Sequence, residues 1–258
     1  MKVVILAGGL GTRLSEETSL KPKPMVEIGG MPIIWHIMKH YYSYGFKEFI
    51  ICCGYRGYQI KEFFANYLMH KSDVIIEPKK KEIKFTSTRT ESWKISCIDT
   101  GQNTMTGGRL LRVKQYIEKD ENFCMTYGDG LSNINLSKLL EFHKTHGKLA
   151  TLTASLPTGK FGALELDGTK VKNFLEKPRG DGNYINGGFF ILSKDTLNLI
   201  DGDHTVFEAE PLTSLSLKNE LRAFKHDGFW QPMDTLRDKI NLENLWNKNK
   251  APWKNWND

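Results

Sequence analysis

Apolar positions along the chain fall into short continuous runs that are separated by stretches at helical spacing. Residues 3–6 (VVIL) form a continuous apolar run typical of a strand buried on both faces, and residues 46–55 (FKEFIICCGY) contain a second such run. Between them, residues 32–44 carry apolar side chains at helical spacing and are followed by Gly45, and residues 58–68 predict a second amphipathic helix. This strand–helix–strand–helix order predicts parallel strands joined by right-handed crossovers.

The pattern changes between residues 73 and 100. Short extended segments follow one another there, and the middle segment, residues 81–89, alternates with a period of two. Antiparallel strands or an inserted β-arm over residues 73–100 would account for this pattern. The α/β rhythm then resumes, with alternating helices and strands predicted at residues 107–118, 122–130, 136–147 and 150–155.

The last third of the chain predicts a hairpin, a strand and a tail. Residues 161–178 form the predicted hairpin, which turns at Asp167 and Gly168; residues 184–192 predict a strand, and residues 235–258 a helical tail rich in aromatic side chains. No internal repeat or low-complexity linker divides the chain. We therefore predict a single α/β domain with a mixed, mostly parallel central sheet and an additional small antiparallel element.

Composition and charge exclude several classes of protein. The chain has 258 residues, of which 40% are hydrophobic and 26% charged, as in ordinary globular proteins. No apolar run approaches the roughly 20 residues of a membrane span, and no signal-peptide pattern opens the chain, so we expect a cytoplasmic protein without a membrane partner. The net charge of +6 comes from cations interspersed with acids, without a basic stripe carrying aromatic residues. This distribution argues against a nucleic-acid partner. The mild positive excess is also compatible with an enzyme that acts on phosphorylated small molecules.

The cysteines predict neither a zinc site nor a disulfide framework. Cys52, Cys53, Cys97 and Cys124 form no C-x-x-C pair, and the first two lie within an apolar, strand-like run. We expect them to be reduced and buried.

A glycine-rich turn follows the first strand. Gly8, Gly9 and Gly11 can take backbone angles closed to other residues, and N–H groups at the end of a strand can cradle a phosphate. The spacing G-G-x-G-T-R differs from the G-x-G-x-x-G of dinucleotide folds and from a P-loop. The segment KPKP follows, and its prolines hold Lys23 on a stiff, extended stretch. The alternative is a tight strand-to-helix turn with solvated cations.

Carboxylates far apart in the chain are the next candidates for chemistry. Asp129 in TYGDG follows a predicted strand, where open parallel sheets bind ligands, and Asp234 lies in WQPMDT. Two carboxylates and phosphates together suit Mg²⁺. Taken alone, Asp129 is more typical of a turn former, and Asp234 of a helix N-cap. Glu176 and Lys177 in FLEKP form an ordinary solvated pair when taken alone, and Asn186 binds a hydroxyl or turns the chain.

Taken together, these motifs resemble the ordered signature of the sugar-phosphate nucleotidylyltransferase family. The chain carries GGLGTRL, KPKP, YGDG, EKP and WQPMDT in the family's order over almost its whole length. Within the family, KPKPMVEIGG, FIICCGYRGYQIKEFF, DTGQNTMTGGRL and GFWQPMDTLRDK are most similar to glucose-1-phosphate cytidylyltransferases. Glu27 departs from the Pro of many members, and alignment from GTRL places the family's phosphate-binding Lys on Lys23 rather than Lys21.

The resemblance implies a Rossmann-like nucleotidyltransferase fold and a reaction. CTP and glucose 1-phosphate would give CDP-glucose and diphosphate, with Mg²⁺ as cofactor, in a homohexamer that serves nucleotide-sugar and O-antigen biosynthesis. The sugar phosphate would attack the α-phosphorus directly and in line, without a covalent intermediate, so that the protein's work is positioning and charge neutralisation.

The resemblance also implies a role for each motif residue. Arg13 and Lys23 would steady the leaving diphosphate, Lys177 would grip glucose 1-phosphate, and Asp129 and Asp234 would hold Mg²⁺. Residues implied to bind the substrates are Leu6, Ala7, Gly8, Gly9, Leu10, Gly11, Thr12, Arg13, Lys23, Thr104, Arg109, Gly128, Glu176, Lys177 and Asn186.

Two alternatives stay open at this point. The first is an enzyme of the same family that uses dTTP or UTP, because base preference rests on a few pocket residues. The second is a nucleotide-sugar sensor that keeps the fold without the chemistry. The combination of Lys23, Asp129, Lys177 and Asp234 argues against the sensor, which has no need of all four.

Overall fold

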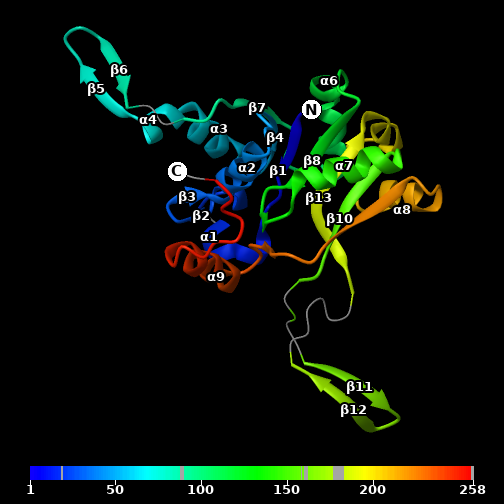
Figure 1. Ribbon diagram of the computed structural model, residues 1–258. Helices are drawn as coiled ribbons and strands as arrows, with labels where there is room; N and C mark the ends of the chain where they lie inside the picture. The colour runs from blue at the N-terminus through cyan, green and yellow to red at the C-terminus, as the bar shows by residue number, and fades with distance from the viewer. Residues whose placement is uncertain (19, 88–89, 158, 160–161, 177–182, 257–258) are drawn as a thin grey trace.

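The computed structural model describes residues 1–18, 20–87, 90–157, 159, 162–176 and 183–256. Their centre is a seven-stranded sheet with the strand order β14-β10-β13-β8-β1-β4-β7, covered by helices (Figure 1). Its strands are β1 (Val3–Ala7), β4 (Glu48–Cys53), β7 (Lys94–Asp99), β8 (Asn122–Tyr127), β10 (Ala150–Ser155), β13 (Ile185–Ser193) and β14 (Leu221–His226).

The sheet is mixed and mostly parallel, as the sequence predicts. Strand β1 pairs in parallel with β4 and β8, β4 with β7, and β10 with β14. Strand β13 runs antiparallel between β8 and β10. Because β1, β4 and β8 run in the same direction, the loops that follow them meet at one edge of the sheet.

Both faces of the sheet are buried, which explains the continuous apolar runs. Val3, Ile5 and Ala7 pack in one hydrophobic cluster, and Val4 and Leu6 in another. The helices with buried residues in the first cluster are η1 (Thr12–Leu14), η2 (Lys23–Met25), α2 (Ile33–Ser43), α3 (Gly57–Ala65), α7 (Leu136–His146) and α9 (Leu236–Asn247). Those in the second are α5 (Thr106–Arg112), α6 (Lys114–Ile117), η4 (Lys194–Leu199) and α8 (Glu210–Leu217).

The antiparallel arm is shorter than the predicted span of residues 73–100. Strands β5 (Asp73–Glu77) and β6 (Glu82–Thr86) form a hairpin that stands away from the body, beyond the short helix α4 (Tyr67–Lys71) (Figure 1). Strand β7 instead joins the central sheet as an edge strand parallel to β4. It does so because Ile95 and Cys97 pack against the hydrophobic core.

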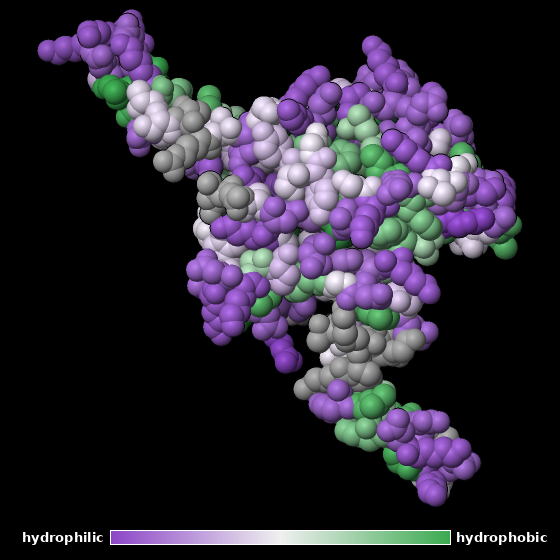
Figure 2. Space-filling model, in the orientation of Figure 1, coloured by the Kyte–Doolittle hydropathy of each residue, from purple (hydrophilic) through white to green (hydrophobic). Residues whose placement is uncertain are grey.

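A second hairpin stands away from the opposite side of the body in Figure 1. Strands β11 (Ala163–Asp167) and β12 (Lys170–Leu175) pair antiparallel and turn through Gly168, whose φ is +58°, at the predicted position. Figure 2 shows apolar residues on this hairpin, and Leu164, Val171 and Phe174 are each at least half exposed.

The C-terminal tail packs onto the body. Helix α9 begins after Thr235, and Trp253 is fully buried further on. Trp246 of α9 lies against Gly29, where a Cβ atom would come within 1.9 Å of the indole nitrogen. The tail thereby holds the turn between β2 (Glu27–Ile28) and β3 (Met31–Pro32), close in sequence to η2 (Lys23–Met25).

The cysteines are free thiols, and three of the four are buried as predicted. Cys52, Cys53 and Cys124 are buried and Cys97 is half-buried. Among the described residues, no helix has the length and apolar character needed to cross a lipid bilayer.

Candidate active site

The glycine turn lies directly after β1 and is held by the backbone of neighbouring strands. Tyr55 donates its backbone N–H to the Gly8 carbonyl at 3.2 Å, and Gly128 donates to the Leu6 carbonyl at 3.0 Å. Gly11 has φ +66°, which favours glycine. The turn then leads into the short helices η1 (Thr12–Leu14) and α1 (Ser15–Thr18).

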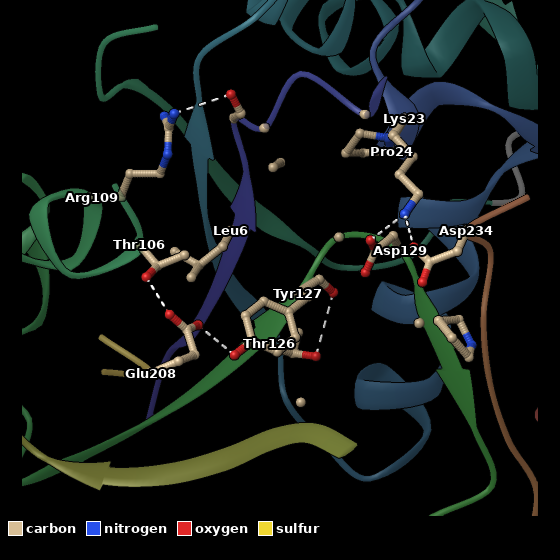
Figure 3. A pocket seen from close by; sticks show the side chains of 18 of the residues that line it. Leu6, Lys23, Pro24, Thr106, Arg109, Thr126, Tyr127, Asp129, Glu208 and Asp234 are labelled. Atoms are coloured by element: carbon tan, nitrogen blue, oxygen red, sulfur yellow. Dashed lines mark hydrogen bonds and ion pairs between the residues drawn. The ribbon is translucent and has the colours of Figure 1, made fainter. Parts of the chain in front are cut away.

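Arg109 of α5 anchors this turn by hydrogen bonds. Its guanidinium donates to the carbonyl oxygen of Gly8 at 3.1 Å, and a Cβ atom on Gly8 would lie 2.0 Å from the guanidinium (Figure 3). The other acceptors of the guanidinium are the carbonyl oxygens of Cys53, Gly101 and Gln102 and the hydroxyl of Thr100. Arg109 therefore joins the ends of β1, β4 and β7, and its donors point at backbone carbonyls and one threonine hydroxyl.

A cavity of about 640 Å³ opens beside the turn at the carboxyl edge of the sheet. Many of the predicted residues line it, which brings segments from four parts of the chain to one place. The predicted residues that line the cavity are Leu6, Ala7, Gly8, Gly9, Gly11, Thr12, Lys23, Thr104, Arg109, Gly128, Asp129 and Asp234.

Lys23, Asp129 and Asp234 meet at one end of the cavity. The Lys23 ammonium lies 2.6 Å from Asp129 Oδ2 and 2.6 Å from Asp234 Oδ1 (Figure 3). The two aspartates are brought together by β9 (Gly130–Ser132) and β15 (Trp230–Pro232), which pair antiparallel, while Met233 donates its N–H to the Asp129 carbonyl at 2.9 Å.

The electrostatics of this cluster favour a cation. Lys23 is only 7% exposed, and its burial lowers the pKa of the ammonium, but the Asp129 and Asp234 carboxylates outweigh this effect and the pKa is raised. One ammonium and two carboxylates leave a single net negative charge. The cluster therefore favours a further cation.

The structure separates the two candidate lysines and the two interpretations of Asp234. Lys21 lies away from the cluster and pairs with Glu27 at 3.2 Å at the surface. The N-cap of α9 is Thr235, which forms a capping box with Asp238. The N-cap alternative for Asp234 is therefore wrong, because the adjacent hydroxyl residue takes that position.

The opposite end of the cavity has hydroxyl groups and a carboxylate, which the sequence did not single out. Glu208 accepts hydrogen bonds from the Thr106 hydroxyl and from the Tyr127 hydroxyl, each at 2.5 Å (Figure 3). Asn186 donates to the Tyr127 oxygen at 3.2 Å. Burial raises the pKa of Tyr127, and the charge of Glu208 raises it further, so the phenol keeps its proton. Tyr127 follows directly from the predicted strand end, whereas no motif marks Glu208.

Several predicted residues do not line the cavity, and others lie outside the residues that the structure describes. Leu10 is half exposed on the glycine turn, and Glu176 follows β12 on the projecting hairpin. Asn186 reaches the cavity wall through Tyr127. Arg13 lies in η1 by its backbone, while its side chain and Lys177 lie outside the described residues.

The donor set at Asp129 and Asp234 fits Mg²⁺ in company with phosphates. The Lys23 ammonium between the two carboxylates shows that a positive charge is accommodated there. Mg²⁺ is commonly held by one or two carboxylates together with substrate phosphates. In the described part of the chain, no cluster of three or more His, Cys, Asp or Glu side chains forms a complete protein cage for a metal.

The fold and site define a nucleotide-handling α/β protein, and comparison with known proteins identifies its class. The family described as nucleotidyl transferase matches residues 2–235, and the chain belongs to this family of enzymes. The glucose-1-phosphate cytidylyltransferases of Salmonella typhi and Salmonella typhimurium are each 59% identical to it over 256 residues, or 99% of this chain and 100% of each relative.

A solved structure has the same fold. HddC from Yersinia pseudotuberculosis, crystallised with GMP-PN, matches with a TM-score of 0.68 and 24% identity over 95% of this chain and 99% of that protein. The predicted Rossmann-like nucleotidyltransferase architecture is thus confirmed.

Proposed function

We propose that this enzyme transfers a cytidylyl group from CTP to glucose 1-phosphate and releases diphosphate, with CDP-glucose as the product. The observation that carries the reaction type is the convergence of Lys23, Asp129 and Asp234 beside the glycine turn. The choice of CTP and glucose 1-phosphate is supported by full-length relatives of that activity at 59% identity.

For this reaction the protein must bring two anions, CTP and glucose 1-phosphate, together and stabilise the negative charge that develops on the leaving diphosphate. The turn at Gly8, Gly9 and Gly11 would bind the triphosphate through its backbone, and Arg109 would keep the turn in place. Lys23 would leave the carboxylates and move onto the departing diphosphate, where charge grows during the reaction.

Asp129 and Asp234 would hold Mg²⁺ beside the α-phosphate. When bound, Mg²⁺ supplies charge neutralisation at the phosphates. The side chains of the cavity then fix the sugar-phosphate oxygen opposite the leaving diphosphate, as an in-line displacement requires.

We also propose that the enzyme assembles as a homohexamer. Both projecting hairpins expose apolar side chains, including Ile76, Ile83 and Phe85 on one and Leu164 and Phe174 on the other. Two-stranded hairpins are marginally stable alone, so contact with another copy would stabilise them.

The proposal is tested by measuring diphosphate release with glucose 1-phosphate and each of CTP, UTP, dTTP and ATP. Turnover with CTP is expected to exceed that with the other nucleotides by at least tenfold. Equal rates with dTTP would contradict the assignment to CTP and favour a thymidylyl enzyme. Diphosphate release with none of the four would contradict the proposed reaction itself.

A further inference from the structure

We propose that Glu208 is the specificity residue for the sugar: its carboxylate accepts a sugar hydroxyl and rejects sugar phosphates that carry a second negative group. This inference rests on the proposed function and concerns the end of the cavity opposite Lys23 (Figure 3). Glu208 lies outside the motifs by which the sequence predicts the site.

The backbone around Glu208 is built to bring its carboxylate into the cavity. The segment that precedes it packs on the start of α5, where Met105 donates its N–H to the Asp203 carbonyl at 2.8 Å and Gly107 donates to the Thr205 carbonyl at 2.9 Å. A Cβ atom on Gly107 would lie 2.7 Å from that Thr205 oxygen. The two segments can therefore approach this closely only with glycine at this position.

The hydrogen bonds at this end all run in one direction, toward Glu208. The Thr106 oxygen accepts a hydrogen bond from the Phe207 N–H at 2.9 Å, and the single hydroxyl proton of Thr106 is donated to Glu208. The Tyr127 hydroxyl likewise donates its proton to Glu208 and accepts a hydrogen bond from Asn186 Nδ2. Gly188 donates its N–H to Asn186 Oδ1 at 2.9 Å, which fixes the orientation of that amide.

The hydrogen-bonding capacity that remains defines the ligand. Each carboxylate oxygen of Glu208 accepts one of these bonds and keeps a lone pair, and the Asn186 amide keeps one N–H. A hydroxyl group, which both donates and accepts, satisfies this combination. A phosphate or carboxylate offers only acceptors and meets a fixed negative charge, so it is rejected.

The position of Glu208 assigns the recognised hydroxyls to the sugar. Lys23, Asp129 and Asp234 mark the phosphate end, and Glu208 lies across the cavity from them, beyond Tyr127 (Figure 3). Asn186, which the sequence singles out as a residue that binds a hydroxyl or turns the chain, belongs to the same chain of hydrogen bonds. A sugar 1-phosphate thus lies with its phosphate toward Lys23 and its hydroxyls toward Glu208.

The test is Glu208→Gln, which keeps the shape of the side chain and removes its charge. We expect the KM for glucose 1-phosphate to rise about tenfold, with the KM for CTP within twofold of wild type. The preference for glucose 1-phosphate over glucuronic acid 1-phosphate is expected to fall at least tenfold. Glu210→Gln, at an exposed position at the start of α8, is the matched control and should change neither value.

A second variant keeps the test decisive if Glu208→Gln folds poorly. Tyr127→Phe retains the Glu208 charge and releases Asn186, so it should raise the KM for glucose 1-phosphate and still reject glucuronic acid 1-phosphate. Unchanged sugar kinetics and discrimination in a folded Glu208→Gln protein would overturn the proposal, as would a raised KM for CTP in place of a raised KM for glucose 1-phosphate.

If the wild type turns over none of the nucleotides, the proposed function fails separately. Thermal shifts with the two sugar phosphates then test Glu208 by the same discrimination.

Discussion

The Lys23 side chain has two roles in the proposed reaction. Without substrate, it balances part of the charge of Asp129 and Asp234, each at 2.6 Å; during the reaction, it would bind the leaving diphosphate. A half-buried carboxylate pair without a counterion is costly, so the lysine stabilises the site that Mg²⁺ would occupy. In the proposed reaction the same residue would therefore link stability, metal binding and turnover.

Lys23→Ala should separate these tasks. We expect turnover to fall by about 10²–10³-fold, since one donor to the transition state is lost. The metal-free variant should lose roughly 1–3 kcal/mol of unfolding free energy, because the two carboxylates repel each other without the ammonium. Mg²⁺ should raise its melting temperature more than that of the wild type, which calorimetry can measure. Lys21→Ala, at the surface, is the control; equal loss in both variants would contradict the assignment to Lys23.

Asp129 and Asp234 should behave as one unit. Replacing either by Asn removes one anionic ligand and keeps the shape, so each variant should lose most activity and need more Mg²⁺. The double variant should be little worse than the poorer single variant, because the effects of residues that act together are not additive. Titrating turnover with Mg²⁺ in the three variants measures this. A fully active Asp234→Asn protein would rule out the two-carboxylate site.

At the scale of elements, local patterns predict what local forces decide. The buried strand β1, the glycine turn and helix α2 follow from apolar spacing and glycine, and the β11–β12 turn from Asp167 and Gly168. The sequence does not distinguish strand β7 from the neighbouring arm, because an edge strand and a projecting hairpin have the same short, half-apolar pattern. Its place depends on pairing with β4, which is a tertiary contact.

The candidate site divides in the same way. Lys23, Asp129 and Asp234 each follow a recognisable motif, so their convergence is predictable once the parallel sheet is assumed. Glu208 lies in the loop before α8, and its position depends on close packing of this loop against Gly107. No local sequence pattern predicts that packing. The sequence could not exclude Asp234 as the N-cap of α9, because Asp is a good capping residue, whereas the structure has Thr235 at that position.

The β5–β6 hairpin makes the proposed assembly testable. Cross-strand pairs Val74–Phe85 and Ile76–Ile83 place four apolar side chains on one face, with Ile76 61% exposed. Ile76→Lys combined with Ile83→Lys should put charge into this face and lower the mass measured by light scattering. Ile75→Lys, on the opposite face, is the control. A wild type that is monomeric at all concentrations would contradict the proposed oligomer.

At the scale of the whole molecule, the C-terminal tail couples folding to pH through buried histidines. His36 lies within an aromatic cluster that includes Trp35, Trp246 and Trp253, donates through Nε2 to the Ile28 carbonyl at 2.8 Å, and accepts from the Trp253 indole at 3.4 Å. That pattern of one donor and one acceptor requires a neutral ring. His40, one turn further along α2, is 2% exposed and hydrogen-bonded to the Ile134 carbonyl.

Stability should therefore fall as the solution is acidified. Burial lowers the pKa of both His36 and His40 to about 4, whereas the unfolded chain binds these protons near pH 6.5. Between about pH 6.5 and 4 the unfolded state holds more protons, so the free energy of unfolding decreases as pH decreases, and above about pH 6.5 the two histidines add no slope. Urea unfolding at a series of pH values measures this slope, to which His36 and His40 together contribute up to two protons. His36→Gln should remove about one of them, while His204→Gln, at an exposed position, should leave the slope unchanged. A slope that is the same in the wild type and in His36→Gln would show that His36 is not the group that titrates.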